Sequence, residues 1–128
     1  WFCPPLQQLG RWIIVVEGGF DRLALLAAGV ADEHIVSLAG TTLQPDWLPA
    51  QVQAIILALD ADATGRAAMT RLVSALETLG LLVITCPPEE DGLGKDWSER
   101  WRRAGIDGVA PLFQLSTSVQ ERLRHLAA

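Results

Sequence analysis

The sequence contains little of what several classes of protein require. Only two of its 128 residues are cysteines, Cys3 and Cys86, and they are too far apart to form a CxxC zinc motif. A single pair is also a poor disulfide framework, so we expect two free thiols in a reducing cytoplasm. Lys and Arg number 10 against 15 Asp and Glu, so no overall positive field points to nucleic acid. A cluster of metal-binding carboxylates would, however, make a nucleic-acid enzyme acidic in the same way.

Long apolar runs are also missing. No stretch approaches the ~20 apolar residues that a membrane-spanning helix needs, so we expect no membrane partner. The N-terminus lacks the charged start and apolar stretch of a signal peptide. The first residue is Trp1 rather than methionine, and we expect the chain to be a segment of a longer protein. Half of the residues are apolar and a fifth are charged, which is typical of one globular domain with a single core.

Four short apolar runs predict buried strands. They cover residues 12–16, 35–38, 54–59 and 81–84. These runs show little polar alternation, which is typical of strands buried on both faces of a parallel sheet. Residues 20–29 and 65–79 carry apolar side chains at helical spacing, and a glycine ends each of these segments. Pro45 and Pro49 leave room for only a short helix or loop over residues 44–53.

The order of these elements predicts an α/β fold. Right-handed crossovers give a Rossmann-like parallel sheet of about four strands with helices on both faces. Further helices are expected over residues 96–104 and 118–126, because each begins with Asp or Ser and has Glu three residues later. We expect a lead-in over residues 1–11, the main domain over 12–110, and a C-terminal helix or linker to a further domain over 111–128.

Two acidic residues directly follow the third predicted strand. Asp60 and Asp62 are two residues apart, so in an extended chain their side chains point to the same side. At ~4 Å and an effective dielectric of about 20, two such charges repel by roughly 4 kcal/mol. Either one carboxylate takes up a proton or a cation lies between them. Carboxylate oxygens favour Mg²⁺ or Mn²⁺.

Further acidic residues are expected at the same edge of the sheet, because the carboxyl ends of parallel strands meet there. Glu17 ends the first strand, and Asp21 would face back from the helix that follows. After the fourth strand, Lys95 and Asp96 add a cation and another acid. Taken singly, Asp21, Asp62 and Asp96 could each be a helix N-cap. Acidic residues at three strand ends predict instead a shared divalent-metal site.

A local basic patch follows in the chain. Its members are Lys95, Arg100, Arg102 and Arg103. The patch could track a nucleic-acid backbone, or it could simply be the solvated face of a helix. Trp97 and Trp101 lie four residues apart on the same predicted helix. We interpret them as packing anchors rather than as platforms for base stacking.

The two acidic motifs together resemble the TOPRIM domain. Glu-Gly-x-x-Asp over residues 17–21 follows one hydrophobic strand, and Leu-Asp-x-Asp-x-x-Gly over residues 59–65 follows another. The resemblance covers most of the chain, from about residue 12 to 103. This family includes bacterial-type primases, topoisomerases, OLD-type nucleases and recombination proteins. Residues 35–41 resemble primase-type members, and residues 94–97 resemble phage and plasmid primases and primase-helicases.

The resemblance implies a TOPRIM fold and a set of roles. Glu17 would be a metal ligand or general acid/base, Asp60 and Asp62 would bind metal, and Asp21 and Asp96 would support them. The implied cofactor is Mg²⁺ or Mn²⁺, and the implied activity is DNA primase-like nucleotidyl transfer. Its implied partners are DNA, nucleoside triphosphates, and a replicative helicase or other domains of the parent chain. The expected catalytic residues are Glu17, Asp60, Asp62 and Lys95, and the expected phosphate contacts are Lys95, Arg66, Arg100 and Arg103.

Three alternatives stay open. In an OLD-like endonuclease the same acids would activate water against a phosphodiester. A non-catalytic module for nucleic-acid binding or partner docking is disfavoured by the intact Glu17, Asp60 and Asp62. Asp60 to Thr64 also fits the DxDxT start of haloacid-dehalogenase-type phosphatases, but here it follows the third apolar run and leads directly into a helix. A topoisomerase would need a nucleophilic tyrosine, and this chain has none.

Overall fold

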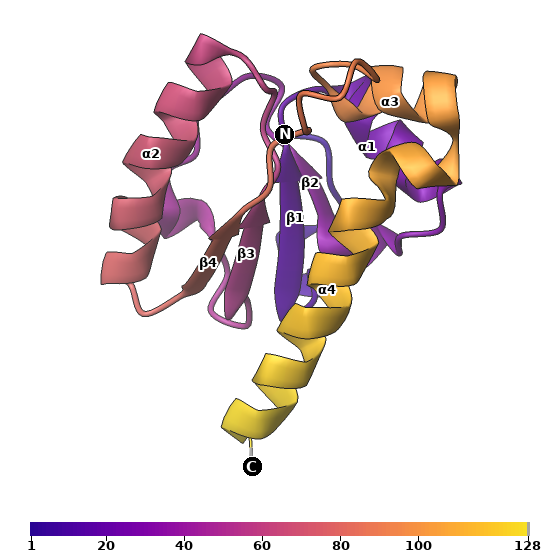
Figure 1. Ribbon diagram of the computed structural model, residues 1–128. Coiled ribbons are helices and arrows are strands. Elements are labelled where there is room, and N and C mark those ends of the chain that lie inside the picture. Colours follow the sequence, from indigo (N-terminus) through magenta and orange to yellow (C-terminus); the bar gives the residue numbers. More distant parts are fainter. Residues whose placement is uncertain (128) are drawn as a thin grey trace.

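A parallel sheet of four strands forms the centre of the molecule, in the order β2-β1-β3-β4 (Figure 1). The computed structural model describes the backbone of residues 1–127 and the side chains of residues 1–125. The strands are Trp12–Val16 (β1), Ile35–Ser37 (β2), Ala54–Leu57 (β3) and Leu82–Thr85 (β4). The predicted four-stranded parallel sheet is confirmed, and the strand ends lie close to the predicted ones.

The two central strands explain the unbroken apolar runs. Residues 13–16 of β1 and 54–57 of β3 are at most 1% exposed. A central strand of a parallel sheet is covered on both faces, so both sets of its alternating side chains must be apolar. At the edge of the sheet, the residues of β4 are only partly buried.

Helices cover both faces of the sheet, as predicted. α2 (Ala63–Thr78) packs on one face, where Met69, Leu72 and Leu76 join the core. α1 (Gly19–Ala27), α3 (Trp97–Ala104) and α4 (Ile106–Ala127) contribute to the second core on the other face. Figure 1 shows α2 on one side of the strands and the other three helices opposite it. Three short 3-10 helices complete the described chain: Leu6–Gln8 (η1), Asp32–His34 (η2) and Pro45–Trp47 (η3).

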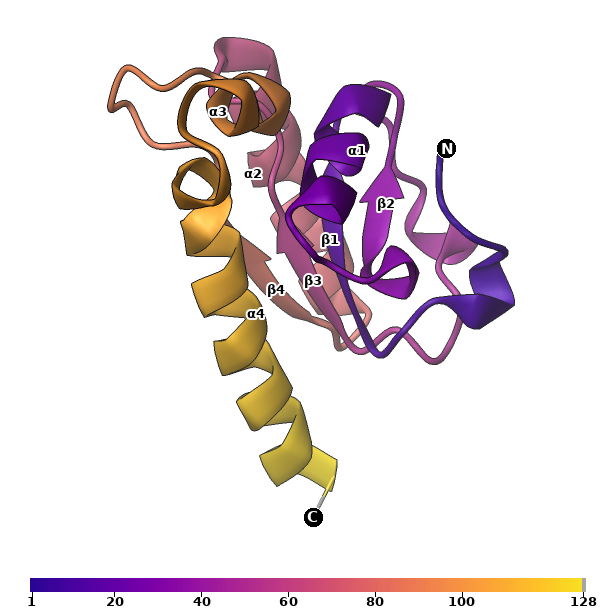
Figure 2. The same ribbon diagram turned by 90° about the vertical axis from the view of Figure 1, so that its right-hand side faces the viewer.

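The C-terminal helix begins at Ile106 and not at Ser118 as predicted. It therefore includes Pro111, which lies in the second turn and removes one backbone hydrogen bond of the helix. Val109 and Leu112, from this unpredicted first part, are fully buried against the sheet. The predicted division between residues 110 and 111 thus falls inside α4. Figure 2 shows this helix running from α3 along the sheet towards the C-terminus.

The structure bears on the two cysteines and on membrane-spanning helices. Cys3 and Cys86 are both free thiols, as predicted. Burial raises the pKa of the Cys86 thiol to about 11, so that thiol is protonated at neutral pH. None of the helices among the described residues has the length and apolar character of a membrane-spanning segment.

Candidate functional site

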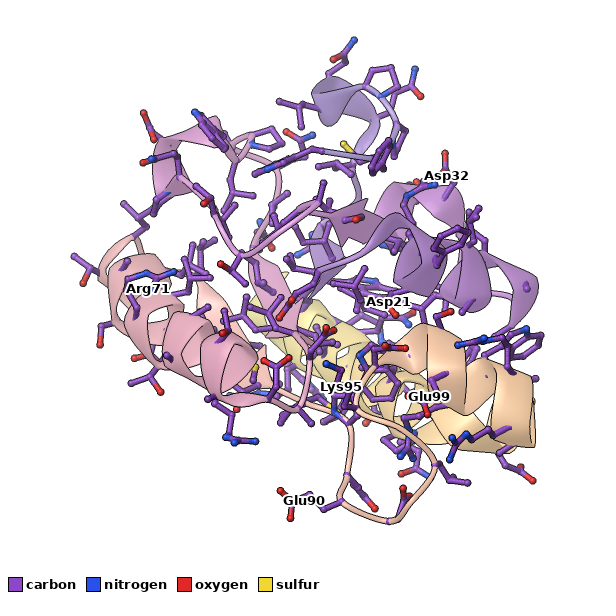
Figure 3. All side chains as sticks on the ribbon, turned by 90° about the horizontal axis from the view of Figure 1, so that it is seen from above. Asp21, Asp32, Arg71, Glu90, Lys95 and Glu99 are labelled. Atoms are coloured by element: carbon purple, nitrogen blue, oxygen red, sulfur yellow. The ribbon has the colours of Figure 1, made fainter. Side chains whose placement is uncertain are left out.

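The predicted acids lie together at the carboxyl-terminal edge of the sheet. β1 and β3 are hydrogen-bonded neighbours, so Glu17 at the end of one lies beside Asp60 at the end of the other. The backbone N–H of Asp60 donates to Glu17 Oε1 at 3.1 Å. Glu17, Asp21, Asp60 and Asp96 line one open pocket of about 430 Å³, which we call the acidic pocket. Figure 3 views this edge from above and labels Asp21 of α1 and Lys95 of the loop before α3.

Asp60 has the most unusual environment of these acids. Its Oδ1 atom is buried and has no hydrogen-bond partner. Burial raises the pKa of Asp60 from 3.8 to about 7, and the charges of Glu17, Asp21, Asp96 and Asp62 add to this effect. A buried carboxylate oxygen without a partner costs about 1–3 kcal/mol. A proton or a cation at this atom is therefore favoured.

Glu17 is held in place from two directions. Its Oε1 accepts the Asp60 N–H, and its backbone oxygen accepts the Ser37 hydroxyl at 3.3 Å and the Gly40 N–H at 3.1 Å. The last two contacts bring the turn after β2 to the site, where Ala39 and Gly40 line the acidic pocket. Burial is the main cause that raises the pKa of Glu17 above its usual range. Glu17 is thus fixed in position at the end of β1.

Asp62 and Asp96 serve as helix caps and also face the site. Asp62 Oδ1 accepts the Gly65 N–H at 2.8 Å at the start of α2. Asp96 Oδ1 accepts the Glu99 N–H at 2.7 Å at the start of α3. One oxygen of each carboxylate is therefore used by a cap. The second oxygen of Asp62 lies beside the Lys95 ammonium, whereas Asp96 lines the acidic pocket. The capping interpretation is confirmed for both residues, and their part in a metal site stays a prediction.

Asp21 is placed differently from the supporting metal ligand that was expected. Its side chain is buried, and its Oδ2 accepts the Gly18 N–H at 3.1 Å. Its Oδ1 accepts the Ser98 N–H at 2.9 Å, which connects α1 to α3. Because both oxygens already accept backbone N–H groups, we interpret Asp21 as a residue that positions the two helices rather than as a ligand.

The acids do not form a finished metal cage. Among the described residues, no group of three or more His, Cys, Asp or Glu side chains is placed to hold an ion. The chemistry nevertheless fits a divalent cation, because the pocket offers hard carboxylate oxygens and the unpartnered Asp60 Oδ1. The candidate ligands are Asp60, Asp62, Glu17 and Asp96, and side-chain rotation is needed for them to meet on one ion.

Lys95 and Arg66 remain available as cations beside the acids. The Lys95 Nζ atom lies 3.7 Å from Asp62 Oδ2, and the side chain is largely exposed. The Lys95 backbone oxygen accepts the Ala61 N–H at 2.8 Å, which holds the two loops together. Arg66 is exposed in the first two turns of α2. Arg103 instead pairs with Glu99 at 2.8 Å and is not among the residues that line the acidic pocket.

The prediction of an exposed basic patch is wrong for Arg100. Its side chain is only 2% exposed and forms a bidentate pair with Asp91, at 2.6 and 3.0 Å. It also donates to the Gly108 carbonyl at 2.8 Å, and its guanidinium lies 5.7 Å from the centre of the Trp97 ring. Arg100 therefore joins the loop before α3 to the start of α4. Its place three residues after Trp97, on the same face of the helix, was the signal for burial.

Six residues that line the acidic pocket were not among the predicted site residues, and the two with large side chains are Phe20 and Arg102. Arg102 is an exposed cation in the pocket wall, four residues after Ser98 on the same face of α3. Phe20 also lines the pocket, and its side chain is 77% exposed. Its place between Gly19 and Asp21 in the acidic motif was the only sequence signal for it. Arg102 therefore adds a positive charge to a pocket that is otherwise lined by several acids.

Trp97 is a packing anchor, as predicted. Its side chain is buried in the core beneath α3, and its Nε1–H donates to the Ala58 carbonyl at 2.8 Å. Trp101 is partly buried against the same core. Neither ring is placed as an exposed platform, and both hold α3 against the end of β3.

Asp60→Asn is expected to stabilise the metal-free protein at alkaline pH. The folded-state pKa of about 7 lies above the usual 3.8. The protonated form therefore stabilises the fold in full below pH ~4, and this contribution is lost as the pH rises through ~7. Without screening by solvent, this contribution to the free energy of unfolding would be about 4 kcal/mol. Because Asp60 is partly exposed, we expect about 1–2 kcal/mol.

The measurement is urea unfolding of both proteins in EDTA at pH 5 and pH 8. The advantage of the variant is expected to grow between these two values. An advantage that is the same at both would show that Asp60 does not titrate in this range.

Comparisons with known proteins connect this geometry with a family. The family model described as Toprim-like matches residues 14–100. The DNA primase of Mycoplasma pneumoniae is 32% identical over 103 residues, which cover 76% of this chain and 16% of that protein. The DNA primase of Myxococcus xanthus is 34% identical over 106 residues, which cover 79% of this chain and 16% of that protein. The chain thus spans a small part of the length of the curated relatives it matches.

Solved structures show the same fold. The primase fragment of the bacteriophage T7 primase-helicase protein superimposes with a TM-score of 0.62 at 23% identity, covering 81% of this chain and 44% of the fragment. The Aquifex aeolicus primase, with its zinc-binding and RNA polymerase domains, gives a TM-score of 0.62 at 24% identity, covering 90% of this chain and 30% of that one. At these identities the likeness supports the fold alone.

Proposed function

This chain belongs to the Toprim-like family, and from that premise we propose that it is the catalytic core of a DNA primase-like replication protein. Its reaction would be metal-dependent nucleotidyl transfer from nucleoside triphosphates in the cytoplasm. The observation that carries the proposal is the buried, unpartnered Asp60 Oδ1 in a pocket lined by acids from three separate stretches of the chain. Primer synthesis would also use DNA, a replicative helicase or other domains of the parent chain.

The proposed ligand set comes from the acids gathered at this edge of the sheet. Asp60, Asp62, Glu17 and Asp96 would hold one or two Mg²⁺ or Mn²⁺ ions. When bound, such ions reduce the charge of a triphosphate and favour in-line attack on its α-phosphate. Gly65 lets the start of α2 approach these residues closely, because a Cβ atom there would lie 2.9 Å from Glu17 Oε1.

The other side chains have roles that follow from charge and position. Glu17 is suited to accept the proton of an attacking 3′-hydroxyl, because its carboxylate lines the acidic pocket beside Asp60 and burial raises its pKa. In that step the hydroxyl oxygen bonds to the α-phosphorus and pyrophosphate leaves. Lys95, beside Asp62, and Arg102, in the pocket wall, would hold phosphate oxygens. Arg66 is a further phosphate contact on the adjacent helix.

The test of the metal site is Asp60→Asn combined with Asp62→Asn. We expect the double variant to lose Mn²⁺ binding, with at least a tenfold fall in affinity by calorimetry, because ionised oxygens are replaced by neutral amides. Asn is also a good N-cap, so α2 is expected to form normally in the variant.

A matched control changes charge elsewhere. Asp46→Asn combined with Glu77→Gln also removes two exposed carboxylates, and neither residue lines the acidic pocket. This control is expected to bind Mn²⁺ as the wild type does. Unchanged affinity in a folded Asp60 and Asp62 double variant would refute the metal site.

An OLD-like endonuclease is the second candidate, because the same acids could activate water. The experiment that separates the two uses the full-length parent protein with labelled DNA and nucleoside triphosphates. Incorporation of nucleotides supports the primase-like reaction, and cleavage of the labelled strand supports the nuclease. Phosphomonoester hydrolysis through a trapped aspartyl intermediate would instead support the phosphatase interpretation.

A further inference from the structure

Large apolar side chains are exposed together beside the acidic pocket. Phe2 is 57% exposed, Phe20 is 77% exposed and Leu23 is 56% exposed. With Gly19 and Arg22 they line a second cavity of about 430 Å³, which we call the aromatic cavity. Exposed apolar side chains that gather in one place mark a binding surface more often than single ones do.

The walls of the aromatic cavity are held in position by the backbone. Phe2 forms an isolated antiparallel bridge with Ser37, with hydrogen bonds of 3.0 Å in both directions. Its ring lies against Gly19, where a Cβ atom would meet the ring at 3.5 Å. Phe20 follows in the first turn of α1. The bridge to β2 therefore holds the Phe2 ring at the end of the sheet, and the start of α1 holds the Phe20 ring there.

Phe20 connects the two cavities, since it lines both of them. Its neighbour Asp21 and the preceding Glu17 belong to the acidic pocket. Arg22 adds little free charge to the aromatic cavity, because it pairs with Asp32 and donates to the Ile35 carbonyl. A charged pocket thus adjoins an apolar aromatic wall with one residue in common.

We propose that Phe20 stacks on the base of the nucleotide whose phosphates lie in the acidic pocket. This inference rests on the proposed function. A nucleotide has its charge at one end and a flat π-face at the other, which matches carboxylates, ions and Arg102 beside an aromatic ring. Such stacking tolerates every base, because each base has a π-face. The aromatic cavity therefore contributes affinity without selecting a sequence.

The experiment compares ATP with a ligand that lacks its base and ribose. ATP and inorganic tripolyphosphate are titrated into the 128-residue chain by calorimetry in saturating Mn²⁺. Phe20→Ala is expected to weaken ATP binding about tenfold, in the range that base–aromatic stacking provides, and to leave tripolyphosphate binding unchanged. Phe20→Trp keeps an aromatic face and is expected to keep the affinity for ATP, whereas Phe20→Leu is expected to lose it.

Controls separate this proposal from its alternatives. Ile106→Ala removes a side chain that is 57% exposed and lies outside both cavities, and it should change neither ligand's affinity. Equal binding of ATP by wild type and Phe20→Ala overturns the stacking role, while retained tripolyphosphate binding leaves the proposed function standing. Binding of neither ligand by the wild type would contradict the proposed function itself. A change in sedimentation with unchanged ATP affinity would identify the cavity as a contact between copies, and would overturn the proposal.

Discussion

Replacing Gly65 by alanine is expected to lower the free energy of unfolding by about 2–3 kcal/mol and to remove Mn²⁺ binding. A Cβ atom at this position would lie 2.1 Å from the carbonyl oxygen of Asp60 and 2.9 Å from Glu17 Oε1. The first of these is a backbone atom, so the turn between β3 and α2 has to move. Such a movement displaces Asp60 from the acidic pocket and shifts Asp62, which caps the same helix. Urea unfolding and Mn²⁺ calorimetry measure the two effects.

Gly19→Ala is the matched control, because Gly19 also lies in the first turn of a helix. A Cβ atom there would meet only the Phe2 ring, at 3.5 Å, which is an ordinary contact. Alanine is the better helix former by about 1 kcal/mol, so this variant is expected to be as stable as the wild type or more so. If Gly65→Ala matches Gly19→Ala in stability and still binds Mn²⁺, the close approach of α2 to Glu17 is not required.

Arg100→Ala is expected to lower the free energy of unfolding by about 3 kcal/mol, as measured by urea denaturation. The substitution removes a buried guanidinium that contacts three separate segments. It leaves the Gly108 carbonyl without its donor and Asp91 without its bidentate partner. A Cβ atom at Gly108 would lie 2.3 Å from the Arg100 carbonyl oxygen, so the two helices already pack at close range. Little room is left for a compensating rearrangement.

The matched control for this prediction is Arg103→Ala on the same helix. Arg103 is exposed and pairs with Glu99, so its loss is expected to cost less than ~1 kcal/mol. Equal effects of the two substitutions would contradict the structural role of Arg100.

The pH provides a second check on this ion pair. Hydrogen bonding to Arg100 lowers the pKa of Asp91 to about 2. The pair therefore stabilises the fold above the usual carboxyl pKa of ~4, and the stabilisation is lost as the pH falls through ~2. The difference in the free energy of unfolding between wild type and Arg100→Ala should therefore become smaller as the pH falls from ~4 to ~2.

The sheet could be predicted because its central strands are buried on both faces. The runs that contain residues 13–16 and 54–57 carry no polar residue, which is typical of a parallel sheet covered on both faces. The start of α4 could not be predicted in the same way. Gly105, Gly108 and Pro111 all favour a loop by local propensity, yet the helix is imposed by the packing of its first part on the sheet.

The meeting of the acids at one edge of the sheet could also be predicted. The hydrogen bonds that their carboxylate oxygens accept could not. Parallel strands place the ends of β1 and β3, and so Glu17 and Asp60, at the same edge. That these two strands are neighbours comes from the structure. The engagement of Asp21 Oδ1 depends on the Ser98 N–H, which lies 77 residues away in the chain. Contacts of this kind arise from the final approach of α3 to α1. The burial of Arg100 has the same origin, since it requires the loop before α3 and the start of α4 to be in place.

The helices α1, α2 and α3 all begin at the edge that carries the acids. Asp21 lies in the first turn of α1, and Asp62 and Asp96 cap α2 and α3. Aligned peptide dipoles give each helix start the equivalent of roughly half a positive charge. Because these partial charges belong to the backbone, neither pH nor side-chain substitution removes them. Once the carboxylates are neutralised, by protons or by a bound divalent ion, the uncompensated dipoles make the same edge attractive to anions.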